Sequence, residues 1–127
     1  MGEKKKILVI DDEELVIKSL EKLLAKEGYE VVSVRNGSDA MKKIDEANFD
    51  LIITDIRMPR LNGIELLSQI REVVKRKGCS PISEICITGY ADDEINRKAE
   101  ALGVADYLYK PFDLRDFLAC VKKNLKA

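Results

Sequence analysis

Residues 50–63 read Asp-Leu-Ile-Ile-Thr-Asp-Ile-Arg-Met-Pro-Arg-Leu-Asn-Gly. The short, largely β-branched run Leu51–Thr54 is typical of a strand that is buried on both faces inside a parallel sheet. The run ends on the carboxylate of Asp55, and a loop containing Pro59 and the Asn62-Gly63 pair then leads to a helical pattern. An acid at that position lies at the edge where α/β sheets bind ligands, although Asp is also a common helix cap.

The same strand-like character recurs along the chain between segments of helical spacing. Strands are predicted at Lys6–Ile10, Glu30–Val34, Leu51–Thr54, Glu84–Ile87 and Asp106–Tyr109. Gly28, Gly78 and Gly103 are predicted to end three of the intervening helices. Strict strand–helix alternation indicates an α/β fold, a parallel sheet with helices on both faces. Right-handed crossovers then favour a flavodoxin-like (βα)5 three-layer sandwich with the strand order 2-1-3-4-5.

Helical spacing also predicts which side chains face the sheet. The first helix is expected to bury Leu15, Val16, Ser19, Leu20, Leu23 and Leu24. The second is expected to carry Ala40, Met41, Ile44 and Ala47, and the fifth Leu114, Phe117, Leu118, Val121 and Leu125. The fourth, from Asp92 to Leu102, has few apolar residues, so it is predicted to be among the less stable elements and to move easily.

Composition limits the classes of function that the chain can have. The 127 residues suit a single domain, 1–127, with 46% hydrophobic and 35% charged residues. The net charge of −1 provides no overall basic field, so we predict no direct binding to nucleic acid. No apolar run is long enough to span a bilayer, so no membrane association is expected. Three widely spaced cysteines indicate reduced thiols and a cytoplasmic location.

The chain contains no histidine. This excludes zinc sites with histidine ligands, nucleophile systems that depend on histidine, and a role as a phosphohistidine carrier. Acid–base or metal chemistry must therefore come from carboxylates, hydroxyls and lysine, and ligands that are all oxygen indicate a hard cation such as Mg²⁺.

Polar residues stand at four predicted strand ends: Asp11 and Asp12 after the first strand, Asp55 after the third, Thr88 after the fourth and Lys110 after the fifth. In the predicted order the first and third strands are neighbours about 4.8 Å apart, which brings the three carboxylates together. Such a cluster is tolerable when a divalent cation shares it. With the hydroxyl and the ammonium, it has the groups needed for phosphoryl transfer to a carboxylate, for which Asp55 is the best candidate.

Each of these residues also has a structural interpretation. Asp11 and Asp12 could complement the dipole of the helix that follows, and we assign Glu13 and Glu14 to that role. Lys110 could be a solvated strand end and Thr88 an ordinary strand residue. The functional interpretation is favoured because all of these residues are predicted to meet at one edge.

Four segments resemble the motifs of response-regulator receiver domains, the CheY-like domains of two-component phosphorelay signal transduction. They are Ile-Leu-Val-Ile-Asp-Asp-Glu-Glu at 7–14, Leu-Ile-Ile-Thr-Asp-Ile-Arg-Met-Pro at 51–59, Ile-Thr-Gly-Tyr at 87–90 and Ala-Asp-Tyr-Leu-Tyr-Lys-Pro-Phe at 105–112. The resemblance covers essentially the whole chain. It implies that Asp55 accepts a phosphoryl group from a sensor histidine kinase or a phosphotransfer protein, and that the domain is a signalling module rather than a turnover enzyme.

The resemblance also implies roles for the residues around Asp55. Mg²⁺ would be held by Asp11, Asp12, Asp55 and the backbone carbonyl of Arg57. Lys110 would contact the phosphoryl group, Thr88 would be the switch hydroxyl and Tyr107 the switch aromatic. A cis peptide at Lys110-Pro111 is also expected.

Phosphorylation is expected to change the face formed by the fourth helix, the fifth strand and the fifth helix, with a downstream effector or a homodimer as its target. Two features depart from the family pattern: a longer segment from Lys75 to Ser83, which could be a separate contact surface, and bulky residues at Arg57 and Tyr90, which could affect the phosphoryl lifetime.

Three other functions remain as alternatives. A magnesium-dependent phosphatase with an aspartyl nucleophile resembles a pattern with a second Asp two residues after the first, where this chain has Arg57. A flavin binder would need a hydroxyl- or glycine-rich phosphate loop after the first strand, where Asp11 and Asp12 would repel a phosphate. A receiver-like interaction module that is not phosphorylated is disfavoured because the expected acids, hydroxyl and lysine are all present.

Overall fold

The computed structural model describes residues 4–58, 61–88 and 93–125. Five strands form one parallel sheet in the order β2-β1-β3-β6-β7. They are β1 (Lys6–Ile10), β2 (Glu30–Val34), β3 (Leu51–Asp55), β6 (Ser83–Thr88) and β7 (Asp106–Tyr109). Counted along the chain as sheet strands one to five, this is the predicted order 2-1-3-4-5, so the flavodoxin-like α/β fold is confirmed.

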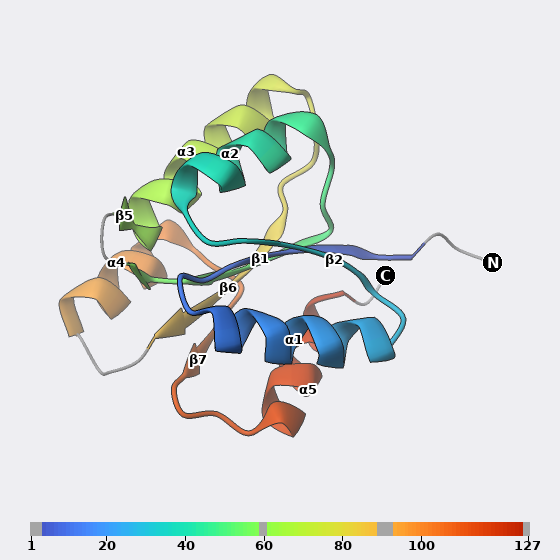
Figure 1. Cartoon of the computed structure of the whole chain (residues 1–127). Helices are drawn as coiled ribbons and strands as arrows, with labels where there is room; N and C mark the ends of the chain where they lie inside the picture. Colours follow the sequence, from blue (N-terminus) through green and yellow to red (C-terminus); the bar gives the residue numbers. More distant parts are fainter. Residues whose placement is uncertain (1–3, 59–60, 89–92, 126–127) are drawn as a thin grey trace.

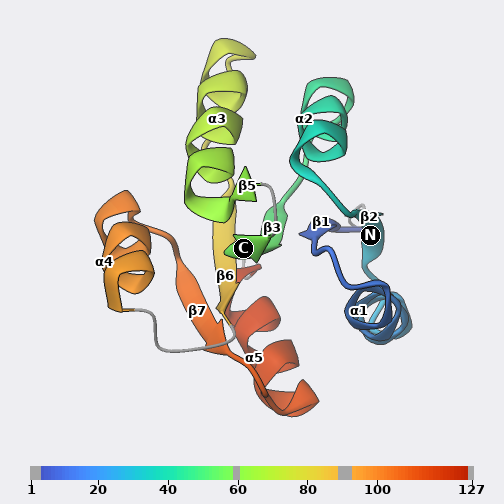
Figure 2. The same cartoon turned by 60° about the vertical axis from the view of Figure 1, so that its left-hand side comes forward.

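Helices cover both faces of the sheet and complete three layers (Figure 1). The helices are α1 (Glu14–Lys26), α2 (Gly37–Glu46), α3 (Gly63–Arg76), α4 (Asp93–Leu102) and α5 (Leu114–Asn124). Helices α1 and α5 lie on one face, while α2, α3 and α4 lie on the other, as the rotated view also shows (Figure 2).

The alternation of side chains along the strands divides the core into two clusters. In β1, Leu8 and Ile10 pack toward α2 and α3, whereas Ile7 and Val9 pack toward α1 and α5. All four side chains are buried, as expected for a strand in the interior of a parallel sheet. Fully buried Phe117 anchors α5 in the second cluster.

The buried face of α1 differs from the prediction. Leu15 is 80% exposed and Ser19 is also exposed, whereas Ile17, Leu20 and Leu24 are buried. Two residues along a helix are turned by about 200°, so burial of Ile17 directs Leu15 into solvent.

Smaller features near the helix ends extend the prediction. Gly28, Gly78 and Gly103 have φ values of 90°, 73° and 77°, in the left-handed region that commonly ends helices, which confirms the three predicted stops. The segment after Asp55 was expected to be a loop, but β4 (Arg57–Met58) and β5 (Leu61–Asn62) form a short antiparallel pair. Ala47 lies outside α2 as its C-cap, rather than within the helix as predicted.

Candidate functional site

The ends of four parallel strands bring the predicted site residues to one edge of the sheet. Asp11 and Asp12 follow β1, Asp55 is the last residue of β3, Thr88 is the last residue of β6, and Lys110 follows β7. The strand register places Asp55 opposite Ile87, so Thr88 is one residue further along the neighbouring strand. The peptide joining Lys110 to Pro111 is cis, as the resemblance implied.

Four carboxylates form a cluster at this edge. One side-chain oxygen from each of Asp11, Asp12, Glu13 and Asp55 lies within 4.8 Å of the others. Asp11 and Asp55 are buried, Asp12 is half-buried and Glu13 is exposed. Oxygen ligands of an octahedral Mg²⁺ are about 3 to 4 Å apart. The cluster therefore has the ligand type and nearly the spacing that a small, hard cation requires.

Asp11 carries the clearest sign of a missing partner. Its Oδ1 accepts a hydrogen bond of 2.9 Å from the backbone N–H of Glu13, but the buried Oδ2 accepts none from the residues that the structure describes. Burial, partly offset by that bond and by the charge of Lys110, raises the pKa of Asp11 from 3.8 to about 6. A buried carboxylate oxygen that accepts no hydrogen bond indicates a site where a cation can bind as its partner.

Lys110 reaches the cluster from the opposite side. Its Nζ lies 3.1 Å from Asp55 Oδ2, 3.7 Å from Asp11 Oδ2 and 3.4 Å from Glu13 Oε1. Partial burial lowers the pKa of Lys110, but the hydrogen bond to Asp55 and the charges of Asp11 and Glu13 outweigh it and raise that pKa overall. Lys110 therefore remains an ammonium that neutralises part of the negative charge.

Thr88 lies on β6, the strand next to β3, and Tyr107 lies on β7, the edge strand beyond it. The Thr88 side chain is fully buried, and its backbone carbonyl accepts a 2.7 Å hydrogen bond from the N–H of Lys110. That bond fixes the main chain of Lys110 beside the end of β6. Tyr107 is half-buried against the cluster that contains α3 and α4.

The prediction assigned Glu13 only to the dipole of α1. Glu13 is the N-cap residue of that helix, its side chain makes no capping hydrogen bond, and its carboxylate instead contacts Lys110. In the sequence, the contact of Glu13 with this site is indicated only by its position directly after the two predicted ligands Asp11 and Asp12. Arg57 follows the cluster in β4, where its backbone is described, and Tyr90 lies outside the described residues.

Gly63 is a further residue whose importance the sequence did not reveal. Its N–H donates a 3.0 Å hydrogen bond to the carbonyl of Ile56. A Cβ at this position would lie 2.8 Å from both the carbonyl oxygen of Asp55 and Cα of Ile56. Only glycine lets α3 begin this close to the segment that carries Asp55. In the sequence, the Asn62-Gly63 pair indicates only a loop.

The structure is thus an α/β protein with a buried carboxylate at the end of its central strand and a cluster of acids and a lysine at the same edge of the sheet. Residues 7–122 match the model of the response regulator receiver domain, and the chain belongs to this family. The CheY-like resemblance is thereby confirmed. Members of the family are signalling domains of two-component systems, generally not turnover enzymes.

Known proteins agree with this assignment. The alkaline phosphatase synthesis transcriptional regulatory protein PhoP of Bacillus subtilis is 38% identical over 123 residues, which cover 96% of this chain and 49% of PhoP. The chain thus spans about half the length of the curated relatives it matches.

Two solved structures show the same fold. The receiver domain from Methanospirillum hungatei has a TM-score of 0.87 and 32% identity, covering 97% of this chain and 94% of that one. The response regulator TrrA from Thermotoga maritima, solved in complex with Mg²⁺-BeF, has a TM-score of 0.79 and 36% identity, with coverages of 95% and 99%.

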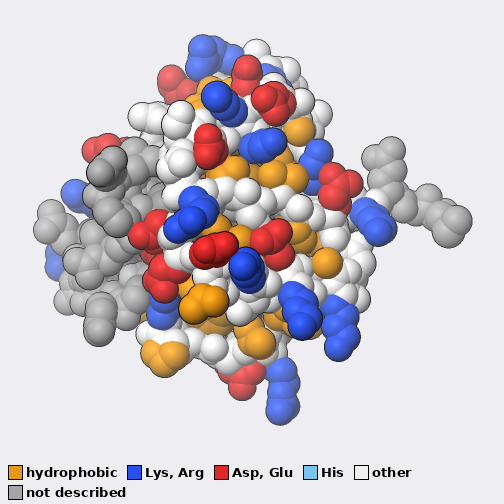
Figure 3. Space-filling model, in the orientation of Figure 1, with side chains coloured by type: hydrophobic (Ala, Val, Ile, Leu, Met, Phe, Trp, Pro, Cys, Tyr) orange, Lys and Arg blue, Asp and Glu red, His pale blue; other side chains and the backbone are white. Residues whose placement is uncertain are grey.

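Two general features of the molecule accompany this assignment. Among the described residues, no helix combines the length and the apolar character needed to cross a membrane. Acidic and basic side chains are interspersed on the face shown in Figure 3, in keeping with the net charge of −1.

Proposed function

We propose that residues 1–127 form a receiver domain in which Asp55 accepts a phosphoryl group from a sensor histidine kinase or a phosphotransfer protein. The observation that carries this proposal is the position of the buried Asp55 carboxylate, inside the acidic cluster and 3.1 Å from the ammonium of Lys110. A carboxylate is a suitable nucleophile for phosphoryl transfer when nearby cations offset the charge of the incoming group.

Mg²⁺ would be held by Asp11, Asp12, Asp55 and the backbone carbonyl of Arg57. The clustered oxygens and the unsatisfied Oδ2 of Asp11 support this assignment. The related TrrA binds Mg²⁺-BeF, which makes the same pair of ligands a reasonable expectation for this chain. When bound, the cation would supply positive charge to the oxygens of the transferring phosphoryl group.

In the proposed transfer, an oxygen of Asp55 forms a bond to phosphorus as the bond from phosphorus to the donor imidazole nitrogen breaks. The imidazole keeps the electron pair of the broken bond and takes a proton from solvent. Lys110, which contacts the Asp55 carboxylate, is close enough to form an ion pair with an oxygen of the transferred phosphoryl group. The Thr88 hydroxyl, one residue past the register partner of Asp55, would donate to another phosphoryl oxygen.

The donor protein is expected to contact exposed apolar side chains beside this edge. Leu15 is 80% and Leu114 is 48% exposed, each in the first turn of its helix. The start of α1 lies beside the segment that leads from β7 to α5, because Glu13 contacts Lys110 at 3.4 Å. We propose that these two leucines form part of the surface to which the donor protein binds.

Phosphorylation would be transmitted through Thr88 and Tyr107 to the face formed by α4, β7 and α5. Tyr107 is only half-buried, which leaves it able to move further inward when Thr88 turns toward the phosphoryl group. Tyr109, 52% exposed on β7, would help to bind a downstream effector domain or protein, or a second copy of the chain. The free thiols of Cys79, Cys86 and Cys120 support a cytoplasmic setting for this exchange.

The test is incubation with acetyl phosphate and Mg²⁺, followed by intact-mass analysis. The protein should gain one phosphoryl group, and EDTA or Asp55→Asn should prevent the gain. Asp50→Asn is the matched control, because it removes a carboxylate just before the opposite end of the same strand and should leave phosphorylation intact. Equal labelling of the Asp55→Asn variant would refute the proposal.

A further inference from the structure

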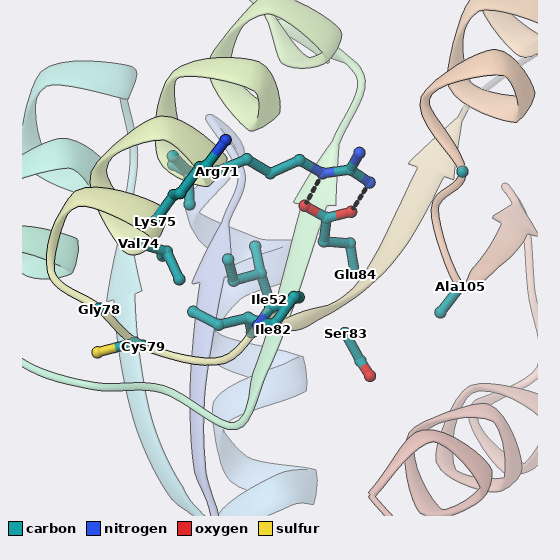
Figure 4. Close-up of a pocket in the computed structure, with 13 residues that line it drawn as sticks. Ile52, Arg71, Val74, Lys75, Gly78, Cys79, Ile82, Ser83, Glu84 and Ala105 are labelled. Carbon is teal, nitrogen blue, oxygen red and sulfur yellow. Dashed lines mark hydrogen bonds and ion pairs between the residues drawn. The ribbon is translucent and has the colours of Figure 1, made fainter.

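A hollow lies at the opposite edge of the sheet from the acids. It has a volume of about 800 Å³ and is bordered by the end of α3, the segment leading into β6 and the turn after α4 (Figure 4). This volume falls within the range of about 300–1,000 Å³ typical of small-molecule sites. The hollow is next to the longer 75–83 segment, which is predicted to be a separate contact surface.

Apolar side chains form much of the wall. Ile52 from β3, Val74 from α3 and Ile82 from the segment before β6 lie together below an ion pair (Figure 4). Ile52 is fully buried and Val74 nearly so, while Ile82 is half-buried. Ile82 and the exposed edge of Val74 can contact the apolar body of a ligand, whereas Ile52, which has no exposed surface, forms the buried floor beneath them.

The polar side of the hollow offers hydrogen-bond donors. Arg71 donates through Nε and a terminal nitrogen to the two carboxylate oxygens of Glu84, which is only 3% exposed, and through its other terminal nitrogen to the carbonyl of Leu102. A guanidinium has five N–H groups, so two donors of Arg71 remain beyond these three contacts. Lys75, one helical turn later, lines the hollow and has no ion-pair partner within the described ranges.

Several acceptors around the hollow are already occupied. Both oxygens of Glu84 bind Arg71, and the carbonyl of Leu102 does as well. At the end of α3, the carbonyls of Val74 and Lys75 accept from the N–H groups of Cys79 and Gly78. Arg71 and Lys75 therefore offer unused cationic donors to the hollow, which favours an acceptor with negative charge.

We propose that this hollow binds a small amphipathic carboxylate, with its apolar body against Val74 and Ile82 and its carboxylate facing Arg71 and Lys75. The site is separate from the phosphoryl site, and its occupancy does not depend on Asp55.

Octanoate is a suitable probe, with octanol as the uncharged control of equal chain length. In a titration followed by ¹H–¹⁵N correlation spectra of the full chain, octanoate should give saturable shifts at the amides of Gly78, Ser83, Gly103 and Ala105. Octanol should bind about two- to fivefold more weakly, the range expected for one partly solvated charge pair.

Lys75→Gln should weaken octanoate binding by about two- to fivefold. Arg76→Gln is the matched control, because Arg76 is an adjacent exposed cation that does not line the hollow, and it should bind octanoate as the unsubstituted protein does. Asp55→Asn should also bind normally, which separates this inference from the proposed function. Absence of saturable shifts at the four amides, or equal binding of octanoate and octanol, would overturn the proposal.

Discussion

Replacing Asp11 by Asn is expected to stabilise the metal-free protein at neutral pH. The carboxylate is 1% exposed, and its pKa is raised from 3.8 to about 6, chiefly by burial. Because the folded state binds this proton more tightly than the unfolded state, the stability of the unsubstituted protein falls as the pH rises from about 4 to about 6. A difference of about two pKa units corresponds to about 3 kcal/mol, and Asn avoids this penalty.

Urea unfolding in EDTA at pH 4 and pH 7.5 measures the effect. The stability advantage of Asp11→Asn should be small at pH 4 and reach about 3 kcal/mol at pH 7.5. Asp45→Asn, which removes an exposed carboxylate from α2, should show little change between the two pH values.

Excess Mg²⁺ should reverse the order at pH 7.5, because a bound cation stabilises the folded state and Asp11 is one of its proposed ligands. An advantage for Asp11→Asn that is equal at both pH values, or that persists unchanged in Mg²⁺, would refute the reasoning about this cluster.

Three further predictions concern packing. Gly63→Ala should lower the free energy of unfolding by about 1–3 kcal/mol, because the added Cβ would clash with backbone atoms at the end of β3. Ser68→Ala, at an exposed position of α3, is the control and should have little effect. Equal urea midpoints for the two variants would contradict this prediction. Arg71→Met should lower the free energy of unfolding by about 3–5 kcal/mol, because it leaves the buried Glu84 carboxylate unpaired. The double variant Arg71→Met/Glu84→Leu should recover most of that loss in the same urea assay. Phe117→Ala should cost about 3–5 kcal/mol in thermal or urea unfolding, and a loss below 1 kcal/mol would argue against its place in the core.

Much of the fold was predictable because the strands are short, apolar and regularly spaced. The pattern around Leu51–Thr54 required burial on both faces, and strand–helix alternation left few possible topologies. The convergence of Asp11, Asp55 and Lys110 followed from one rule, that the carboxyl ends of parallel strands share an edge.

The remaining features depend on contacts that no local pattern contains. Glu13 meets Lys110 across 97 positions of sequence, through a loop whose path only the folded chain defines. Glu84 is an acid within an apolar strand, which is a signal of a buried ion pair, but nothing in the sequence identifies Arg71 as its partner. The exposure of Leu15 depends on which side of α1 meets the sheet, and apolar spacing allowed more than one choice.

The identity of the phosphorylated residue can be determined by chemical trapping. Borohydride reduces an aspartyl phosphate to homoserine, so the protein would be treated with acetyl phosphate and Mg²⁺, reduced, digested and sequenced by mass spectrometry. Homoserine should occur at position 55 and nowhere else. Homoserine at position 11 or 12, or its absence from every peptide while the intact protein carries phosphate, would contradict the assignment of Asp55 as the acceptor.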